Sequence, residues 1–119
     1  GFRMPKSTPE EVKIRKEAIE NATKYATEIP FKVMETAYNS MEVMMIMAKK
    51  GIQNSLSDAG VGALCARTAV VGAYFNVRIN AKDIKDRAFA EEILFKAKEI
   101  YNKTNSLENE MIQLIDSKI

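Results

Sequence analysis

The chain has 119 residues, of which 46% are hydrophobic, enough for one modest core but not for two independent domains. Lys and Arg number 18 against 16 Asp and Glu, and this balance excludes the strongly basic surface typical of nucleic-acid-binding proteins. There is no histidine and one cysteine, Cys65, so the commonest zinc ligands and every Ser-His or Cys-His nucleophile are missing. Acid–base chemistry would fall to Asp, Glu, Lys or Tyr, and we expect no metal.

The cellular setting follows from the same composition. One cysteine cannot form an internal disulfide, and neither a signal peptide nor an unbroken run of about 20 apolar residues is present. We therefore expect a cytoplasmic protein that binds neither membrane nor nucleic acid. The chain begins GFRMP without an initiator methionine, and we expect residues 1–119 to be a single domain cut from a longer protein.

The first predicted helix begins at Thr8 or Ser7, where a hydroxyl cap, Pro9 and two early carboxylates coincide. Apolar residues at spacings of three and four continue to Ile29. Pro30 lacks a backbone donor and disfavours helix in the residue before it. We therefore predict that this helix ends or kinks at Ile29 and that a second one begins there.

The second predicted helix ends at Lys49-Lys50-Gly51, since two lysines followed by glycine indicate a C-terminus with a left-handed cap. Flexible methionine thioethers on one broad face of this helix could shape a ligand groove, but core packing is the favoured interpretation. The methionines are Met34, Met41, Met44, Met45 and Met47.

Two further helices complete an all-α bundle of about four long helices, with no strand. The third is predicted from Ser55–Asp58, with Ser57 or Asp58 as the N-cap, to about Asn80. The fourth is predicted to start near Asp83 or Asp86. Steps of four and three along it form a seam that should pack along another helix. The seam residues are Ile93, Ala97, Ile100, Thr104, Leu107, Met111 and Leu114.

One face of the third helix combines small residues with polar groups at its ends. It consists of Asp58, Gly62, Cys65, Ala69, Gly72, Asn76 and Asn80. Glycine inside a helix costs about 1 kcal/mol against alanine, so another backbone or a ligand should lie very close to this face. The alternative is a tight helix crossing, in which the two asparagines meet solvent or a neighbouring backbone. The pattern alone leaves the function open.

Four strings in register resemble the family of formimidoyltetrahydrofolate cyclodeaminases and methenyltetrahydrofolate cyclohydrolases. They are residues 3–11 (RMPKSTPEE), 54–61 (NSLSDAGV), 72–80 (GAYFNVRIN) and 83–89 (DIKDRAF). The resemblance implies the C-terminal part of a larger all-helical domain that forms homodimers or higher homo-oligomers. In animals this domain is fused to a formiminotransferase domain. Members also carry, upstream of the RMPK-like string, a Gly-rich loop and a catalytic acidic residue, and neither occurs in this chain.

The resemblance also implies a reaction, in which the cyclodeaminase closes 5-formiminotetrahydrofolate to 5,10-methenyltetrahydrofolate and expels ammonia during histidine degradation. Folate would be the substrate, and no cofactor is expected. Hydrolysis of the methenyl bridge by a cyclohydrolase is an alternative that the sequence does not separate. A third alternative, from a different class, is a catalytically inactive dimerisation fragment.

The resemblance gives several residues possible roles. Asp58 would line the site, recognising the pterin ring or transferring a proton. Asn76 and Asn80, one helical turn apart, each offer the donor and acceptor that a pterin edge requires. Arg78 could meet the anionic glutamate tail of folate, and Lys49 and Lys50 could do so as well, although a solvated surface is favoured for the lysines. Ser57 is included as a substrate contact but is favoured as a cap, and we expect Cys65 to be buried in packing.

Overall fold

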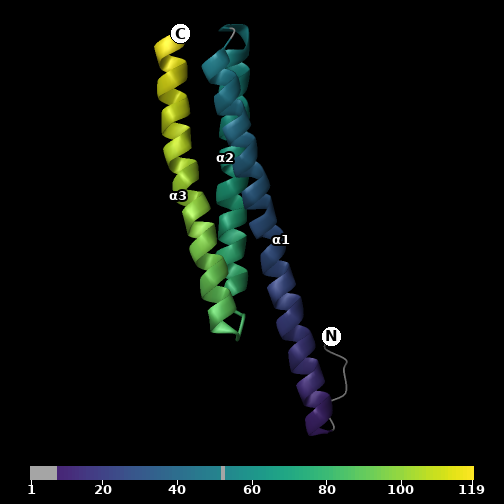
Figure 1. Cartoon of the computed structure of the whole chain (residues 1–119). Helices are drawn as coiled ribbons and strands as arrows, with labels where there is room; N and C mark the ends of the chain where they lie inside the picture. Colours follow the sequence, from purple (N-terminus) through teal and green to yellow (C-terminus); the bar gives the residue numbers. More distant parts are fainter. Residues whose placement is uncertain (1–7, 52) are drawn as a thin grey trace.

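The computed structural model describes residues 8–51 and 53–119, and the regular structure in these ranges is helical. Helix α1 spans Pro9–Lys50, α2 spans Gln53–Ala81 and α3 spans Arg87–Lys118. The three helices form a narrow bundle with extents of 68 × 23 × 16 Å (Figure 1). The all-α prediction is confirmed, but the described residues form three helices instead of about four.

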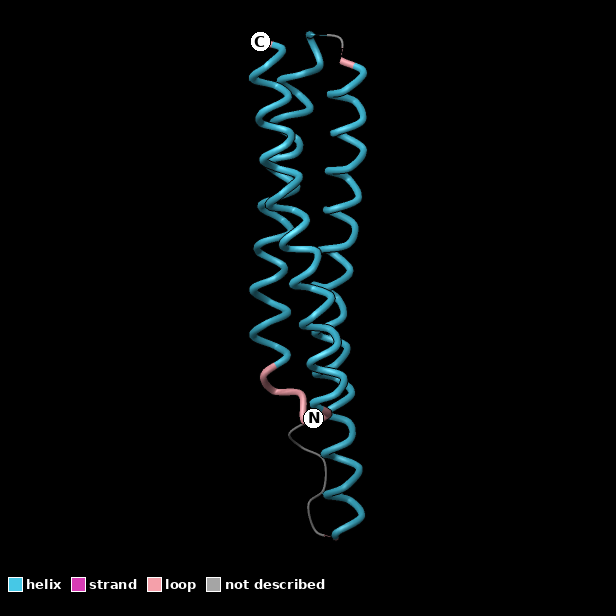
Figure 2. Tube along the Cα trace, turned by 60° about the vertical axis from the view of Figure 1, so that its left-hand side comes forward, coloured by secondary structure: helices cyan, strands magenta, loops and turns pink. Residues whose placement is uncertain are grey.

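Helix α1 is longer than the hairpin formed by α2 and α3. Its first turns extend past the turn that joins α2 to α3, where they have no helical neighbour (Figure 2). Ile14 in this overhang is 51% exposed, and Ile19 near the turn is 44% exposed. The remaining length of α1 lies against the hairpin.

The prediction that one helix ends at Ile29 and a second begins there is wrong, because α1 runs through Pro30 as one helix. Thr27 and Met34, on either side of the proline, are both fully buried, so the core holds the backbone before and after it. Proline leaves the carbonyl of Ala26, four residues earlier, without its helical donor. The side-chain Nδ2 of Asn80 in α2 donates to this oxygen at 3.0 Å.

Of the other three predicted helix starts, two are confirmed and one is wrong. The Thr8 hydroxyl accepts from the Glu11 backbone N–H at 3.1 Å, and the Asp86 carboxylate accepts from that of Phe89 at 3.2 Å. Both are N-cap bonds of the usual kind. Helix α2, however, already begins at Gln53, so Ser57 and Asp58 lie in its second turn and are not N-caps.

Gly51 ends α1, but without the predicted left-handed cap. Its φ is −39°, which many residues adopt, so conformational freedom does not explain the glycine. A Cβ there would lie 2.7 Å from the carbonyl oxygen of Ala48, so close approach explains it instead. From the far end of α3, Lys118 Nζ donates to the carbonyls of Ala48 at 2.9 Å and Lys49 at 3.1 Å. The carbonyl of Ala48 also accepts from the Gly51 backbone N–H at 3.3 Å, and that of Lys49 is one that the end of a helix leaves open.

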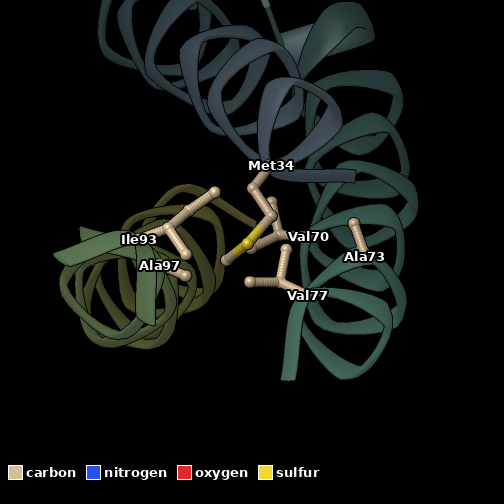
Figure 3. Packing of buried hydrophobic residues seen from close by; sticks show 6 residues of the cluster. All are labelled: Met34, Val70, Ala73, Val77, Ile93 and Ala97. Carbon is tan, nitrogen blue, oxygen red and sulfur yellow. The ribbon is translucent and has the colours of Figure 1, made fainter. Parts of the chain in front are cut away.

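The core lies along the axis of the bundle. Figure 3 shows Met34 of α1 reaching between Val70 and Val77 of α2 and Ala97 of α3. A second cluster, nearer the α1–α2 connection, is formed by Met45, Ala48, Leu56, Ala59, Ala63 and Met111. The predicted seam of α3 is confirmed, since Ile93, Ala97, Thr104 and Met111 are buried and the other members are partly buried.

The turn between α2 and α3 is tied to α1 by charged groups. The Glu20 carboxylate accepts the backbone N–H groups of Lys85 at 2.9 Å and Asp86 at 2.8 Å. These two bonds, that of Lys85 first, lower the pKa of Glu20 below its ordinary value of 4.5. Lys24 pairs with Asp86 at 3.0 Å, and this bond is the main cause that lowers the pKa of Asp86 below 3.8.

We predict that below about pH 4.5 the unfolding temperature of the Glu20→Gln variant depends less on pH than that of the wild-type chain. A carboxyl with a lowered folded-state pKa stabilises the fold fully above its unfolded pKa, and that stability is lost as the pH falls through the folded pKa. The unfolding temperature of the wild-type chain should therefore fall as the pH drops below about 4.5, and that of the variant should fall less steeply. Glu17→Gln, an exposed substitution one turn away, is the control. Equal acid slopes for wild type and Glu20→Gln would contradict the prediction.

Candidate functional site

Helix α2 is apolar around nearly its whole circumference, although α1 and α3 cover only one side of it. By length and composition alone, Ser55–Ala81 could cross a membrane, but only 22% of its most apolar window is buried in this chain. A helix at the centre of a larger helical assembly has the same composition. Four large side chains on its uncovered side, named here the outer face, are about half exposed or more. They are Val61 at 61%, Leu64 at 48%, Phe75 at 52% and Ile79 at 61%.

The face of α2 with small residues exists as predicted, because the whole series lies on one continuous helix. At Gly62 a Cβ would lie 2.9 Å from the Met44 sulfur, so the end of a side chain from α1 lies close there. At Gly72 a Cβ would meet nothing within 4 Å among the described residues. Cys65 is exposed, so the prediction that it is buried is wrong. Within this chain α1 covers only one edge of the face.

The α1–α2 groove is a shallow hollow of about 400 Å³ between the two helices. It has apolar walls with two amide side chains at one end, a composition typical of ligand sites. Its lining consists of Ala26, Ile29, Pro30, Val33, Ala69, Ala73, Asn76 and Asn80. A neighbouring hollow of about 360 Å³ shares Ala26 and Asn80 and adds the carboxylate of Asp83.

The two asparagines differ in what they are free to do. Asn80 Nδ2 donates to the Ala26 carbonyl. This side chain therefore binds the backbone of the neighbouring helix, which the sequence offered as the alternative to ligand contact. Asn76, one turn earlier, is exposed at the wall of the α1–α2 groove. Asn76 is therefore the polar side chain best placed to meet a molecule in the groove.

The remaining residues predicted for the site lie elsewhere. The Arg78 guanidinium lies 5.4 Å from the ring centre of Tyr74, which stacks on Tyr101 of α3 at 4.7 Å. Arg78 therefore faces the α3 side of α2, away from the groove. Lys49 and Lys50 are exposed at the opposite end of the bundle.

Ser57 and Asp58 are also distant from the groove. Asp58 is 18 positions before Asn76 on a single helix, which corresponds to about 27 Å. Asp58 is exposed, and Ser57 lines a separate hollow of about 230 Å³ between α2 and the end of α3. In one chain, Asp58 and Asn76 cannot contact the same pterin ring.

The wall that α1 contributes to the groove was not predicted from the sequence. Ala22 and Ala26 lie one turn apart and, with Ile29 at 50% and Val33 at 44% exposure, form a partly uncovered flank of α1. Alanines at a spacing of four are the small residues that a close helix crossing needs, and this spacing was the available signal. Because a helix break was predicted at Pro30, residues on the two sides of it were not considered as one face.

Comparison with known proteins identifies the family. Residues 1–99 match the family model described as formiminotransferase-cyclodeaminase. A methenyltetrahydrofolate cyclohydrolase of Methylorubrum extorquens is 35% identical over 119 residues, which is all of this chain and 57% of that protein. Formimidoyltransferase-cyclodeaminases of Rattus norvegicus and Gallus gallus are 39% and 41% identical over 92 residues, covering 77% of this chain and 17% of each relative.

By name, these relatives are enzymes of folate one-carbon chemistry, and each aligns with most or all of the sequence that forms this helical bundle. The chain belongs to the formiminotransferase-cyclodeaminase family, as the resemblance of its four strings predicted. It spans little more than half of the cyclohydrolase and about a sixth of the longer relatives.

The bond between Asn80 and Ala26 yields a prediction about stability. Asn80→Ala should lower the free energy of unfolding by about 1–2 kcal/mol, because it leaves the carbonyl exposed by Pro30 without a donor. Pro30→Ala restores the helical N–H, so in that background the same change should cost less than about 0.5 kcal/mol. Urea unfolding of the two single variants and the double variant measures the coupling. Asn76→Ala, on the same groove wall, is the control and should change stability by less than about 0.5 kcal/mol. Equal costs of Asn80→Ala in both backgrounds would disprove the pairing.

Proposed function

We propose that the parent protein is a cytoplasmic formimidoyltetrahydrofolate cyclodeaminase, which converts 5-formiminotetrahydrofolate to 5,10-methenyltetrahydrofolate and releases ammonia. The match of residues 1–99 to the family is the observation that carries this proposal. The similarity to animal formimidoyltransferase-cyclodeaminases favours ammonia release, together with a formiminotransferase as partner domain or protein in the histidine-derived pathway. No cofactor or metal is required in this scheme.

The cyclohydrolase reaction is the second candidate, because the methenyltetrahydrofolate cyclohydrolase aligns with the full length of the chain. Both reactions need a cleft for the pterin and differ mainly in whether water enters. Detection of ammonia released from 5-formiminotetrahydrofolate separates them. A third candidate, for the isolated 119 residues, is a catalytically inactive dimerisation module, since the chain spans only 57% of the cyclohydrolase with which it aligns.

The chemistry defines what the site must supply. N10 of the folate loses a proton as it attacks the formimino carbon, and the departing nitrogen gains one, so a group must transfer protons near neutral pH. Developing charge also needs hydrogen-bond donors nearby. Asp58 is the proposed carboxylate from this chain, as a ring contact or a proton carrier, and Asn76 is the proposed amide partner of the pterin edge.

Secondary contacts are assigned by position. Asn80 completes the polar end of the α1–α2 groove while its Nδ2 is held by Ala26. Arg78 lies on the α3 side of α2, away from the groove, with its cation exposed, so it could meet the glutamate tail of folate only where that tail passes around α2. Ser57 is adjacent to Asp58 and would assist at that end. We propose that the parent forms a homodimer or higher homo-oligomer, since the outer face of α2 is too apolar to remain in water.

We predict that the full-length parent cyclises 5-formiminotetrahydrofolate, while the 119-residue chain is weak or inactive. Loss of a positioned acid–base group usually lowers the rate by about 10²- to 10⁴-fold. In the parent, Asp58→Asn and Asn76→Ala should each impair turnover or folate affinity without lowering the unfolding temperature, because both side chains are exposed. The assay follows methenyltetrahydrofolate absorbance and ammonia together.

Two results would count against this assignment. Full activity of the 119-residue chain would show that no upstream group is needed. Wild-type kinetics in both variants would remove Asp58 and Asn76 from the site. Glu17→Gln, exposed on α1 and distant from the groove, controls for general effects of surface substitution.

A further inference from the structure

Two hollows adjoin between α1 and the end of α2. They are the α1–α2 groove and the neighbouring hollow of about 360 Å³, named here the turn hollow, and they share Ala26 and Asn80. Each has a volume within the range of about 300–1,000 Å³ that is typical of ligand pockets. The turn hollow is lined by Ala18, Ile19, Ala22, Thr23, Ala26, Asn80 and Asp83. Among these described residues, Asp83 alone carries a charge.

The Asp83 carboxylate is available to a ligand. It is exposed and, within the part of the chain that the structure describes, its side chain has no hydrogen bond or ion pair. The other two carboxylates at this turn are occupied, since Glu20 accepts the backbone N–H groups of Lys85 and Asp86. The Asp86 carboxylate caps α3 and pairs with Lys24. Of the three, Asp83 is therefore the one that can accept hydrogen bonds from a bound molecule.

The backbone around Asp83 is held in place from several directions. The Asp83 N–H donates to the Asn80 carbonyl at 3.2 Å, and the Ile84 N–H donates to the Ala81 carbonyl at 3.3 Å. The Ile84 side chain is buried, and the Arg87 guanidinium donates to the carbonyls of Ala81 and Ile84 at 3.1 and 3.0 Å. Because this turn is already ordered, a ligand does not have to order it on binding, and the entropic cost of binding is lower.

Asp83 lies much closer to Asn76 than Asp58 does. Asn80 follows Asn76 by one turn of α2, and Asp83 is bound to the Asn80 backbone at the end of the helix. Asn76 and Asp83 are therefore about two turns, or about 10 Å, apart, whereas Asp58 and Asn76 are about 27 Å apart. Two amides and one carboxylate thus form a short polar row along the two hollows, opposite the alanines of α1.

We propose that Asp83 binds the N–H edge of the pterin ring, in a site that runs from the turn hollow into the α1–α2 groove. A pterin presents its 2-amino group and its N3–H side by side, and the two oxygens of a carboxylate can accept such a pair of donors together. Asn76 contributes its amide to the same ligand farther along the groove. Asp83, instead of Asp58, is then the ring contact from the same chain as Asn76. The identity of the ligand rests on the proposed function, whereas the unpaired carboxylate and the two hollows do not.

Binding of two folates to the full-length parent tests this contact. The probes are 5-formyltetrahydrofolate and its 2-desamino-2-methyl analogue, which lacks the 2-amino donor, and calorimetry measures both affinities. Asp83→Asn should weaken binding of 5-formyltetrahydrofolate about 10- to 100-fold, because the asparagine NH₂ group opposes the 2-amino group. It should weaken binding of the analogue less than about threefold, because the asparagine oxygen still accepts from N3–H. Glu110→Gln, an exposed loss of charge on α3 that lines neither hollow, is the control and should leave both affinities unchanged.

The outcomes separate this inference from the proposed function. Asp83→Asn should keep the wild-type unfolding temperature, so weaker binding would not come from misfolding. Equal losses of affinity for the two probes, or no loss for either, would overturn the contact between Asp83 and the pterin edge. The predicted dependence on Asp83 in a parent that releases no ammonia from 5-formiminotetrahydrofolate would keep the contact and reject the proposed reaction. Ammonia release together with wild-type affinities in Asp83→Asn would do the reverse.

Discussion

The passage of helix α1 through Pro30 is supported by one hydrogen bond between helices, from the side chain of Asn80 to the carbonyl of Ala26. A proline in the middle of a helix of 42 residues normally breaks or bends it, because it removes one bond and pushes away the carbonyl four residues earlier. Here that carbonyl meets a donor from α2, and the helix continues. The same bond fixes α1 against α2 where the α1–α2 groove lies, so the continuity of the long helix and the shape of the groove have a common cause.

Local sequence was sufficient to predict those features whose causes lie within a few residues. The caps at Thr8 and Asp86 follow from their own side chains, and the seam of α3 follows from its spacing. Pro30 was misjudged because its compensating donor is 50 positions away in the sequence. Gly51 was misjudged because its role depends on the approach of Ala48 and not on its own φ.

The candidate site was predicted less completely for a related reason. Periodicity placed Asp58 and Asn76 on one face of α2, but it contains no information about what covers that face. Burial of Cys65 was expected because small residues usually surround a packed position, yet most of this face is uncovered within the chain.

At both ends of the bundle, side chains of one helix bind groups of another. At one end Glu20 and Lys24 hold the α2–α3 turn, and at the other Lys118 holds the last carbonyls of α1. Helix termini are ordinarily where a protein frays first. In this molecule, local opening should instead begin in the overhang of α1, which has no helical neighbour, while the joined ends of the three helices open together. Unfolding of the packed part should therefore be cooperative, without one helix peeling away before the others.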